Sequence, residues 1–446
     1  MRPSNGDHSM LRLVASLGVA VGMLVCAAPQ PIRAQQDGEL TWSRLSDRKP
    51  SVMAFSPDFA ADRLVLLGNS NKDIEHGIWR STDGGDTWVK SSQGIPDGKK
   101  IDVYDIVFSP VFTQDHTIFA SVNKQKVAMK EAPGALYRST DSGQSWEEVQ
   151  MSGFPSRGVR PLQDLRSLSL SPGFAQDGTM FAVASATGLY RSTDRGSTWK
   201  QLLVENATDI QAAPTYPQEP LVATTTNSAG ILFSEDGGDT WAPRNTGIEG
   251  VRNFKQVNFS PNFAQDRTML ALSSSDGIFI TRNAGETWEN IARPPANEQM
   301  AMLATTPDFV SEGVLAYALT NSEVFLSTDL GRTWKSTDAA DILGGQIQSL
   351  FLSPDFLASQ ILYAVSVFGG LYRYYPVLAG SKQAAAATAA AIRATSTAQA
   401  IPTALAKEQA VRQEGLSETG CIAYYIAPPF LLGVWVLSRR QRGLRR

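Results

Sequence analysis

The segment that decides the fold is residues 188–199, GLYRSTDRGSTW, because copies of it recur along the whole chain. Close copies begin at Gly77 and Ala135, and weaker copies begin at Gly230, Gly277 and Glu323, with a truncated one at Gly370. The seven starting points lie 42 to 58 residues apart. A repeat of this length indicates one supersecondary unit that is stacked many times.

A second signature precedes each copy. It reads FSPDFAAD at residues 55–62 and returns at 108–115, 170–177 and 259–266, with weaker forms at 305–312 and 352–356 and a degenerate one at 213–216. Alternating apolar residues flank it, which is the period of a β-strand. Each unit is therefore predicted to hold four strands, and four-stranded units of about 40–50 residues are typical of β-propeller blades.

The last unit lacks its fourth strand, since the chain leaves it at residues 374–376. The N-terminal segment 40–45, LTWSRL, matches the fourth strands that begin at Trp88 and Trp334. We therefore predict an all-β fold, a seven-bladed propeller over residues 39–377, in which residues 40–45 lie beside 370–375 and close the ring. We expect this propeller to be monomeric.

The hairpin motif Ser/Thr-x-Asp-x-Gly-x-Thr/Ser-Trp resembles the Asp-box, or bacterial neuraminidase repeat. Its acidic position is a natural acceptor for the N–H groups of a tight turn, its glycine suits a positive φ, and its tryptophan suits packing between sheets. Because the motif occurs once per blade and chemistry needs one site, a structural role is favoured. The residues given this role are Asp83, Asp141, Asp194, Asp236, Asn283 and Asp329, with Trp88, Trp146, Trp199, Trp241, Trp288 and Trp334.

Several families share this motif. Sialidases, xyloglucan-degrading hydrolases and sortilin-type ectodomains carry it, and the layout here is most similar to the seven-bladed photosystem II assembly factor family. The resemblance covers about residues 39–377. It implies the fold, but it does not by itself imply one activity.

Composition narrows the chemistry. The 446 residues are 42% hydrophobic with a formal net charge of -3, which argues against a disordered chain and against a nucleic-acid partner. The histidines are His8, His76 and His116, and the cysteines are Cys26 and Cys421. This excludes a Cys/His zinc site and leaves little for a nucleophilic triad, so no metal and no cofactor are expected.

The N-terminal residues 1–34 are predicted to be a signal peptide, with an early basic segment, an apolar run over 13–28 and cleavage after Ala34. Two alternatives remain open. Cys26 is the residue that lipidation would use, although the bulky Val25 before it is unfavourable. An uncleaved N-terminal anchor is the other alternative.

The C-terminal part is predicted to be a membrane anchor. Residues 378–419 form an Ala/Thr-rich linker, or stalk, residues 420–438 form a transmembrane helix, and residues 439–446 form a basic cytoplasmic tail with five arginines. We therefore expect a single-pass protein of the cell membrane with the propeller on the extracytoplasmic side. Residues 416–420, LSETG, resemble a sortase sorting signal, which makes cell-wall attachment an alternative.

A glycoside hydrolase needs two carboxylates that face one cleft. The weak catalytic candidates are Asp102, Asp105 and Asp164, near the starts of inner strands, and their spacing does not pair them. The Arg-Ile-Pro segment of sialidases is absent from the sequence. Arginines do recur at one repeat position, where we expect blade-surface residues: Arg80, Arg138, Arg191 and Arg373.

Loop lengths favour a binding site. Links between blades and links from second to third strands share one face of a propeller, and the blades 1–3 have long ones there, over 69–76, 91–101, 123–134 and 151–164. These links carry eight cationic and five acidic residues, and loops on a rigid scaffold often carry function. The candidate binding residues are Lys124, Lys126, Lys130, Arg157 and Arg160.

The sequence therefore predicts a non-enzymatic binding or assembly module for a protein or glycan partner. The alternative is an Asp-box glycoside hydrolase, sialidase-like or xyloglucanase-like, that acts on extracellular glycans.

Overall fold

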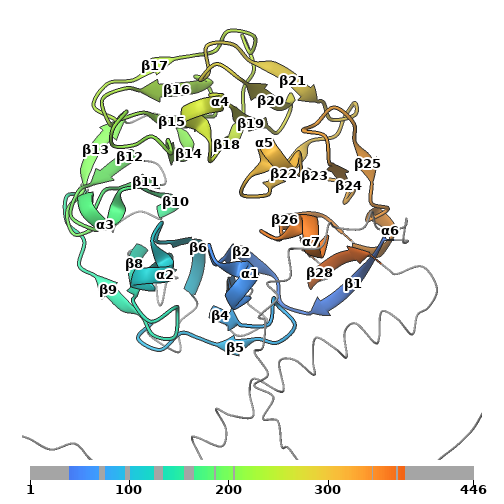
Figure 1. The fold of residues 1–446 in the computed structure, drawn as a ribbon, viewed down its shortest axis with the longest axis horizontal. Helices are drawn as coiled ribbons and strands as arrows, with labels where there is room; N and C mark the ends of the chain where they lie inside the picture. The colour runs from blue at the N-terminus through green and yellow to red at the C-terminus, as the bar shows by residue number, and fades with distance from the viewer. Residues whose placement is uncertain are drawn as a thin grey trace, which may run out of the picture.

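The computed structural model describes residues 40–69, 76–95, 101–124, 134–154, 165–184, 187–203, 206–343, 345–367 and 370–376. Within them, seven four-stranded antiparallel sheets stand side by side in a ring (Figure 1). The predicted all-β, seven-bladed propeller is confirmed. The predicted signal peptide with Cys26, the stalk, the segment 416–420, the transmembrane helix and the basic tail lie outside the described residues.

Each blade runs outward from an inner strand at the central channel. Its strands are, in that order: blade 1, β2 (Pro50–Phe55), β3 (Val65–Asn69), β4 (Gly77–Ser81), β5 (Val89–Lys90); blade 2, β6 (Ile101–Phe108), β7 (Ile118–Lys124), β8 (Gly134–Ser139), β9 (Glu147–Val149); blade 3, β10 (Leu165–Leu170), β11 (Met180–Ala184), β12 (Gly188–Ser192), β13 (Lys200–Leu203); blade 4, β14 (Ala207–Ala212), β15 (Val222–Thr226), β16 (Ile231–Ser234), β17 (Ala242–Pro243); blade 5, β18 (Phe254–Phe259), β19 (Met269–Ser273), β20 (Gly277–Thr281), β21 (Glu289–Ala292); blade 6, β22 (Met300–Thr305), β23 (Leu315–Leu319), β24 (Val324–Ser327), β25 (Lys335–Ser336); blade 7, β26 (Ile347–Leu352), β27 (Leu362–Ser366), β28 (Gly370–Pro376), β1 (Leu40–Ser46).

The ring closes as the sequence predicts. Strand β1 pairs antiparallel with β28, with Leu40 opposite Pro376 and Trp42 opposite Tyr374. The indole Nε1 of Trp42 donates a hydrogen bond to the carbonyl oxygen of Thr337 at 3.2 Å, which ties the closing strand to the end of blade 6. The first and last described segments of the chain therefore share one sheet.

The Ser-Pro signature forms a single helical turn where the sequence suggested only a turn. In α1 (Phe59–Asp62), the Ser56 hydroxyl donates to Asp62 Oδ2 at 2.6 Å, and Asp62 Oδ1 accepts the N–H of Leu64. Phe59 is buried beneath this turn. The equivalent helices are α2 (Phe112–Asp115), α3 (Phe174–Asp177), α4 (Phe263–Asp266), α5 (Phe309–Glu312) and α7 (Phe356–Ser359), and α6 (Ala340–Leu343) lies in a link between blades.

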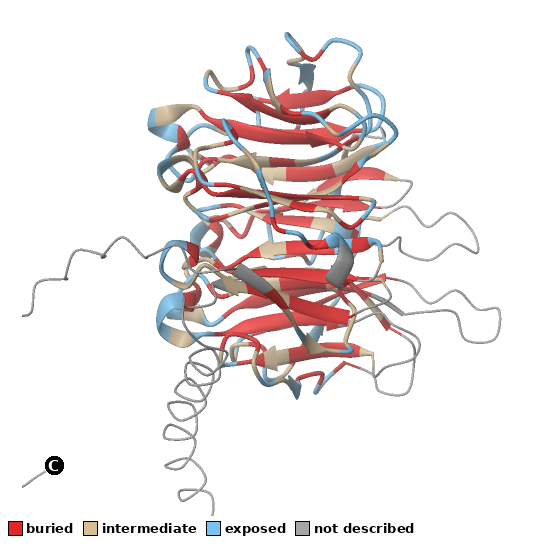
Figure 2. Ribbon diagram, turned by 90° about the vertical axis from the view of Figure 1, so that its right-hand side faces the viewer, coloured by how far each residue is buried: buried red, intermediate tan, exposed pale blue. Residues whose placement is uncertain are grey.

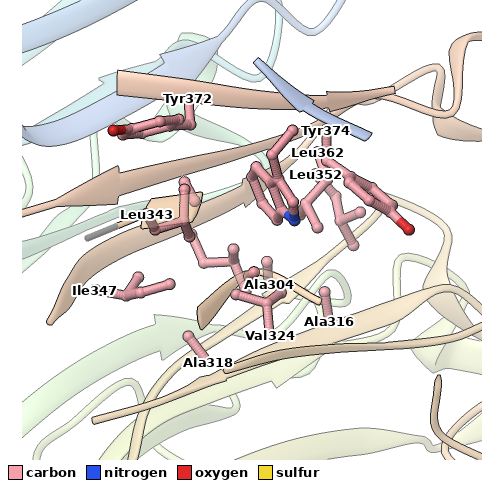
Figure 3. Packing of buried hydrophobic residues seen from close by; sticks show 14 of the residues in the cluster. Ala304, Ala316, Ala318, Val324, Leu343, Ile347, Leu352, Leu362, Tyr372 and Tyr374 are labelled. Carbon is pink, nitrogen blue, oxygen red and sulfur yellow. The ribbon is translucent and has the colours of Figure 1, made fainter. Parts of the chain in front are cut away.

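Apolar packing between adjacent sheets holds the blades together. The second strand of each blade is buried at every residue whose exposure is described, whereas the inner strands mix buried and more exposed residues (Figure 2). Between blades 6 and 7, Ala316 and Val324 pack against Leu352 and Leu362 in one cluster (Figure 3). Small residues on one sheet opposite leucines on the next allow close approach of the two sheets.

The strand order gives the propeller two distinct faces. The one-turn helices between first and second strands and the Asp-box hairpins between third and fourth strands lie at the same end of the blades that have them, and Figure 2 shows most of the helices on that side. We call this the Asp-box face. The links between blades and the links from second to third strands lie on the opposite side, which we call the loop face.

Candidate functional site

Each Asp-box turn is held by its own side chains. In blade 3, the hydroxyls of Ser192 and Thr198 donate to the two carboxylate oxygens of Asp194 at 2.8 and 2.7 Å. The N–H of Thr198 donates to Asp194 Oδ1, and the N–H of Gly196 donates to the hydroxyl of Ser192. Both carboxylate oxygens accept hydrogen bonds from within the turn, which favours a structural role over acid or base chemistry.

The same pattern recurs in the other five boxes. Asn283 replaces the acid in blade 5 and still accepts the N–H of Thr287. In blade 6, hydrogen bonds from the hydroxyl and the N–H of Thr333 lower the pKa of Asp329 to about 2. The box positions with this geometry are Asp83, Asp141, Asp194, Asp236, Asn283 and Asp329.

Three of the four repeated arginines reach into the box of the next blade, rather than lying on the blade surface as the sequence suggested. Arg80 Nε donates to the carbonyl oxygen of Ser142, and Arg191 Nη1 donates to that of Gly237. Arg373 Nη1 lies 2.7 Å from Asp86 Oδ1 across the closing seam. Arg138 instead pairs with Glu147 of its own blade. The box turn is thus the docking point for the preceding blade.

The box tryptophans fill the gaps between blades. Trp146, Trp199 and Trp288 are buried, and the indole of Trp146 donates to the carbonyl oxygen of Ser91 in the previous blade at 2.8 Å. Trp88, Trp241 and Trp334 are partly buried. A glycine that the sequence analysis missed makes room for this contact: a Cβ at Gly94 would lie 1.8 Å from the Trp146 carbonyl oxygen.

The central channel carries the second group of acidic residues. Asp105 follows a bulge in β6, and its Oδ2 accepts the N–H of Leu168 from the next blade at 2.8 Å. Asp209 holds the equivalent place in β14, where it accepts the N–H of Val257 at 3.0 Å and the Ser167 hydroxyl at 2.7 Å. Sequence analysis singled out Asp105 but missed Asp209, although an isoleucine directly follows each of them.

The channel acids are bound to backbone. Asp105 and Asp209 each accept a neighbouring blade's N–H group, so they act as ties between inner strands. Asp102 lies on β6 and is half-buried, and Asp164 lies outside the described residues. The catalytic set of Asp102, Asp105 and Asp164 therefore stays a prediction. In the described ranges, no cluster of three or more His, Cys, Asp or Glu side chains is arranged to hold a metal.

The candidate binding residues are predicted for the loop face, and one of the five lies in the described part of the chain. Lys124 is the last residue of β7, which ends on that face, and Lys126, Lys130, Arg157 and Arg160 lie outside the described residues. In blades 4–6 the links from second to third strands are short, as between β19 and β20 or β23 and β24. There a run of backbone bonds joins the blades, with Asn253 N donating to Asn227 O and Ser274 N to Asn253 O.

Comparison with known proteins agrees with this geometry. Residues 189–202, which span the blade 3 box, match the BNR-Asp box repeat. The chain is thus a seven-bladed propeller that carries the Asp-box repeat in this blade. A curated xyloglucanase from Paenibacillus sp. is 24% identical over 256 residues, 54% of this chain and 23% of that enzyme. The chain thus spans about a quarter of the length of this relative.

Solved structures show the same fold in an enzyme and in a protein of another kind. The GH74 xyloglucanase from Xanthomonas campestris matches with a TM-score of 0.55 and 15% identity, over 76% of this chain and 54% of that chain. YCF48 bound to a D1 peptide matches with a TM-score of 0.53 and 17% identity, over 77% of this chain and 99% of that chain. YCF48 from Cyanidioschyzon merolae matches with a TM-score of 0.50 and 15% identity, over 75% and 98%. At these identities the likeness shows the fold alone.

None of the helices in the described ranges has the length and hydropathy that a membrane span requires.

Proposed function

We propose that this chain is an exported, membrane-anchored binding or assembly module, which holds a protein partner on the loop face of blades 1–3. The observation that carries the proposal is that the box and channel carboxylates are engaged as internal ties. Asp194 is bonded within its turn, and Asp105 and Asp209 are bonded to neighbouring strands. A glycosidase site needs two carboxyl groups turned toward a substrate.

The unequal lengths of the links support the choice of surface. Strands β7 and β8 are separated by residues 125–133, whereas β19 and β20 are separated by residues 274–276. The longer links of blades 1–3 contain Lys126, Lys130, Arg157 and Arg160 in the sequence. Cationic side chains on one sector favour an acidic partner surface and steer its approach.

The positions of the chain ends support an outward-facing loop face. Strand β28 starts at the loop face and ends at Pro376 on the Asp-box face, where Leu40 of β1 pairs with it. The proposed stalk therefore begins on the Asp-box face. An anchor that follows Pro376 would hold that face toward the membrane and leave the loop face accessible.

The similar structures add weight to a protein partner. The printed title of one YCF48 structure states that it is bound to a D1 peptide, and the similarity covers 99% of that chain. Only 54% of the Xanthomonas xyloglucanase is covered. A glycan partner, or hydrolysis of a glycan, is the second candidate, and it rests on the 24% identity to the Paenibacillus xyloglucanase.

The experiment compares partner capture from the native membrane fraction by the full-length parent and by a triple variant, Lys124→Glu, Lys126→Glu and Lys130→Glu. We expect capture of the same acidic partner to fall strongly in the variant and to weaken with salt in the parent. The melting temperature should not change, because exposed charges contribute little to stability.

A matched control reverses three lysines on outer strands: Lys90, Lys200 and Lys335. Loss of capture in the control but not in the loop variant would place the site on the rim. Hydrolysis of xyloglucan by the parent, abolished by Asp102→Asn or Asp105→Asn in a folded protein, would replace the binding proposal with the hydrolase.

A further inference from the structure

The inner strands around the channel are tied together by two kinds of side chain. Between blades 7, 1 and 2 the ties are serine hydroxyls: Ser349 donates to the carbonyl oxygen of Ser51 at 3.3 Å, and Ser51 donates to that of Val103 at 2.6 Å. From blade 2 to blade 5 the ties include the carboxyl groups of Asp105 and Asp209, beside a hydroxyl tie from Thr208 to the carbonyl oxygen of Phe254 at 2.7 Å. The ties between the inner strands of blades 2 to 5 therefore include ionisable side chains, whereas the serine ties between blades 7, 1 and 2 do not.

The carboxyl ties form a continuous belt. Asp105 of β6 accepts the N–H of Leu168 in β10, and the neighbouring Ser167 donates its hydroxyl to Asp209 Oδ1 in β14. Asp209 Oδ2 then accepts the N–H of Val257 in β18 at 3.0 Å. Each acid also accepts the N–H of the residue that follows it. Two carboxyl groups and one hydroxyl thus connect four consecutive inner strands.

The donors to both carboxyl groups are uncharged. The belt bonds come from backbone N–H groups and one serine hydroxyl. On the inner strands in contact, the charged side chains are Asp102 on β6, Arg166 on β10 and Lys255 on β18, with none on β2. No charged residue lies on four of the neighbouring second strands: β3, β11, β15 and β19. Lys124 is the last residue of the fifth, β7. On the third strands, Arg80 of β4 binds the carbonyl oxygen of Ser142 and Arg138 of β8 pairs with Glu147.

Burial in this setting disfavours the charged form of each acid. Burial raises the pKa of Asp105 to about 7, with the nearby charge of Asp209 adding to it and the Leu168 N–H opposing it. Burial likewise raises the pKa of Asp209 to about 6, against the hydrogen bonds from Val257 and Ser167. Both values lie above the ordinary value for aspartate, so the folded protein takes up these protons more readily than the unfolded chain.

We propose that Asp105 and Asp209 form a proton-sensitive pair in the channel wall, which makes the union of blades 2 to 5 stronger near pH 5 than near pH 8. Protonation removes the negative charge of the buried Asp209 and that of the partly buried Asp105, and with them the repulsion between the two. A group whose folded-state pKa is raised stabilises the fold in its protonated form, and this stabilisation is lost as pH rises through that pKa. The device is independent of any partner on the loop face.

The test measures the unfolding equilibrium of the full-length chain in urea from pH 5 to pH 8, for the parent, Asp105→Asn and Asp209→Asn. The ratio of the parent's unfolding constant to that of the variant should rise with pH, by up to about a hundredfold for Asp105 and about tenfold for Asp209. The control is Asp58→Asn, at an exposed residue whose side chain makes no cap bond, and its ratio should stay flat.

Ratios for both channel variants that change by less than about twofold over this range would overturn the proposal, because both acids would then titrate alike in the folded and unfolded states. If either variant does not fold, the parent labelled with carbon-13 at aspartate carboxyl groups gives a second measurement. Two aspartate signals should titrate near pH 6 and pH 7. A spectrum in which every aspartate is ionised by pH 5 would equally refute it.

Discussion

Replacement of Trp42 by alanine tests the closure of the ring at a single side chain. Trp42 is 7% exposed in the cluster between blades 6 and 7. Its ring lies 5.0 Å from that of Tyr374, and its indole N–H donates to Thr337 of the preceding blade link. These contacts join the first strand of the propeller to its last sheet and to the blade before it.

We expect Trp42→Ala to lower the free energy of unfolding by about 3–5 kcal/mol, the range for a buried tryptophan that leaves a cavity. Trp42→Phe keeps most of the apolar contact and loses the N–H donor, so about 1 kcal/mol is expected from the lost hydrogen bond. The difference between the two variants, about 2–4 kcal/mol, then reports the packing of the closing strand.

The assay is urea unfolding of the full-length chain, followed by tryptophan fluorescence and by circular dichroism. Val89→Ala is the control, because Val89 is 70% exposed on an outer strand and should change stability by less than about 0.5 kcal/mol. A Trp42→Ala protein that unfolds within about 0.5 kcal/mol of the parent would refute the reasoning, since β1 would then contribute nothing to closure.

Three further predictions concern the boxes and their neighbours. Asp194→Ala should lose about 1–3 kcal/mol of stability through three lost hydrogen bonds, whereas Asp194→Asn should lose less, because Asn283 shows that an amide fits this turn; equal losses in urea unfolding would contradict this. Gly94→Ala should be far more destabilising than Gly250→Ala, because both have positive φ but only Gly94 has a carbonyl oxygen, at 1.8 Å, in the way of a Cβ; similar melting temperatures would show that the Trp146 contact yields easily. Stability should also fall as pH drops from about 4 toward 2, because Thr333 lowers the pKa of Asp329 to about 2 in the folded protein. The charged form of Asp329 stabilises the fold at pH values above its pKa in the unfolded chain, and this stabilisation is lost as pH falls through the folded-state pKa. A melting temperature that stays constant over this range would argue against the box bonds.

The sequence by itself determined the architecture. The repeated GLYRSTDRGSTW segment, the Ser-Pro signature and the alternation of apolar residues are local patterns, and local hydrogen bonds form the structures that they predict. The Asp194 turn is closed by residues within four positions of it. Closure of the ring could also be predicted from the sequence, because the last unit lacks a fourth strand after Tyr375 and a spare strand lies at residues 40–45.

Only the tertiary structure decided what the polar side chains do between blades. Arg191 donates a hydrogen bond to the carbonyl oxygen of Gly237, 46 residues away in the sequence, and Asp105 accepts one from the N–H of Leu168, 63 residues away. Nothing in the local pattern distinguishes Asp105 from a strand-end acid in solvent or from a catalytic carboxylate. Its role follows from the way two sheets meet at the channel, which brings the carboxyl group of one strand within 2.8 Å of an N–H group of the next.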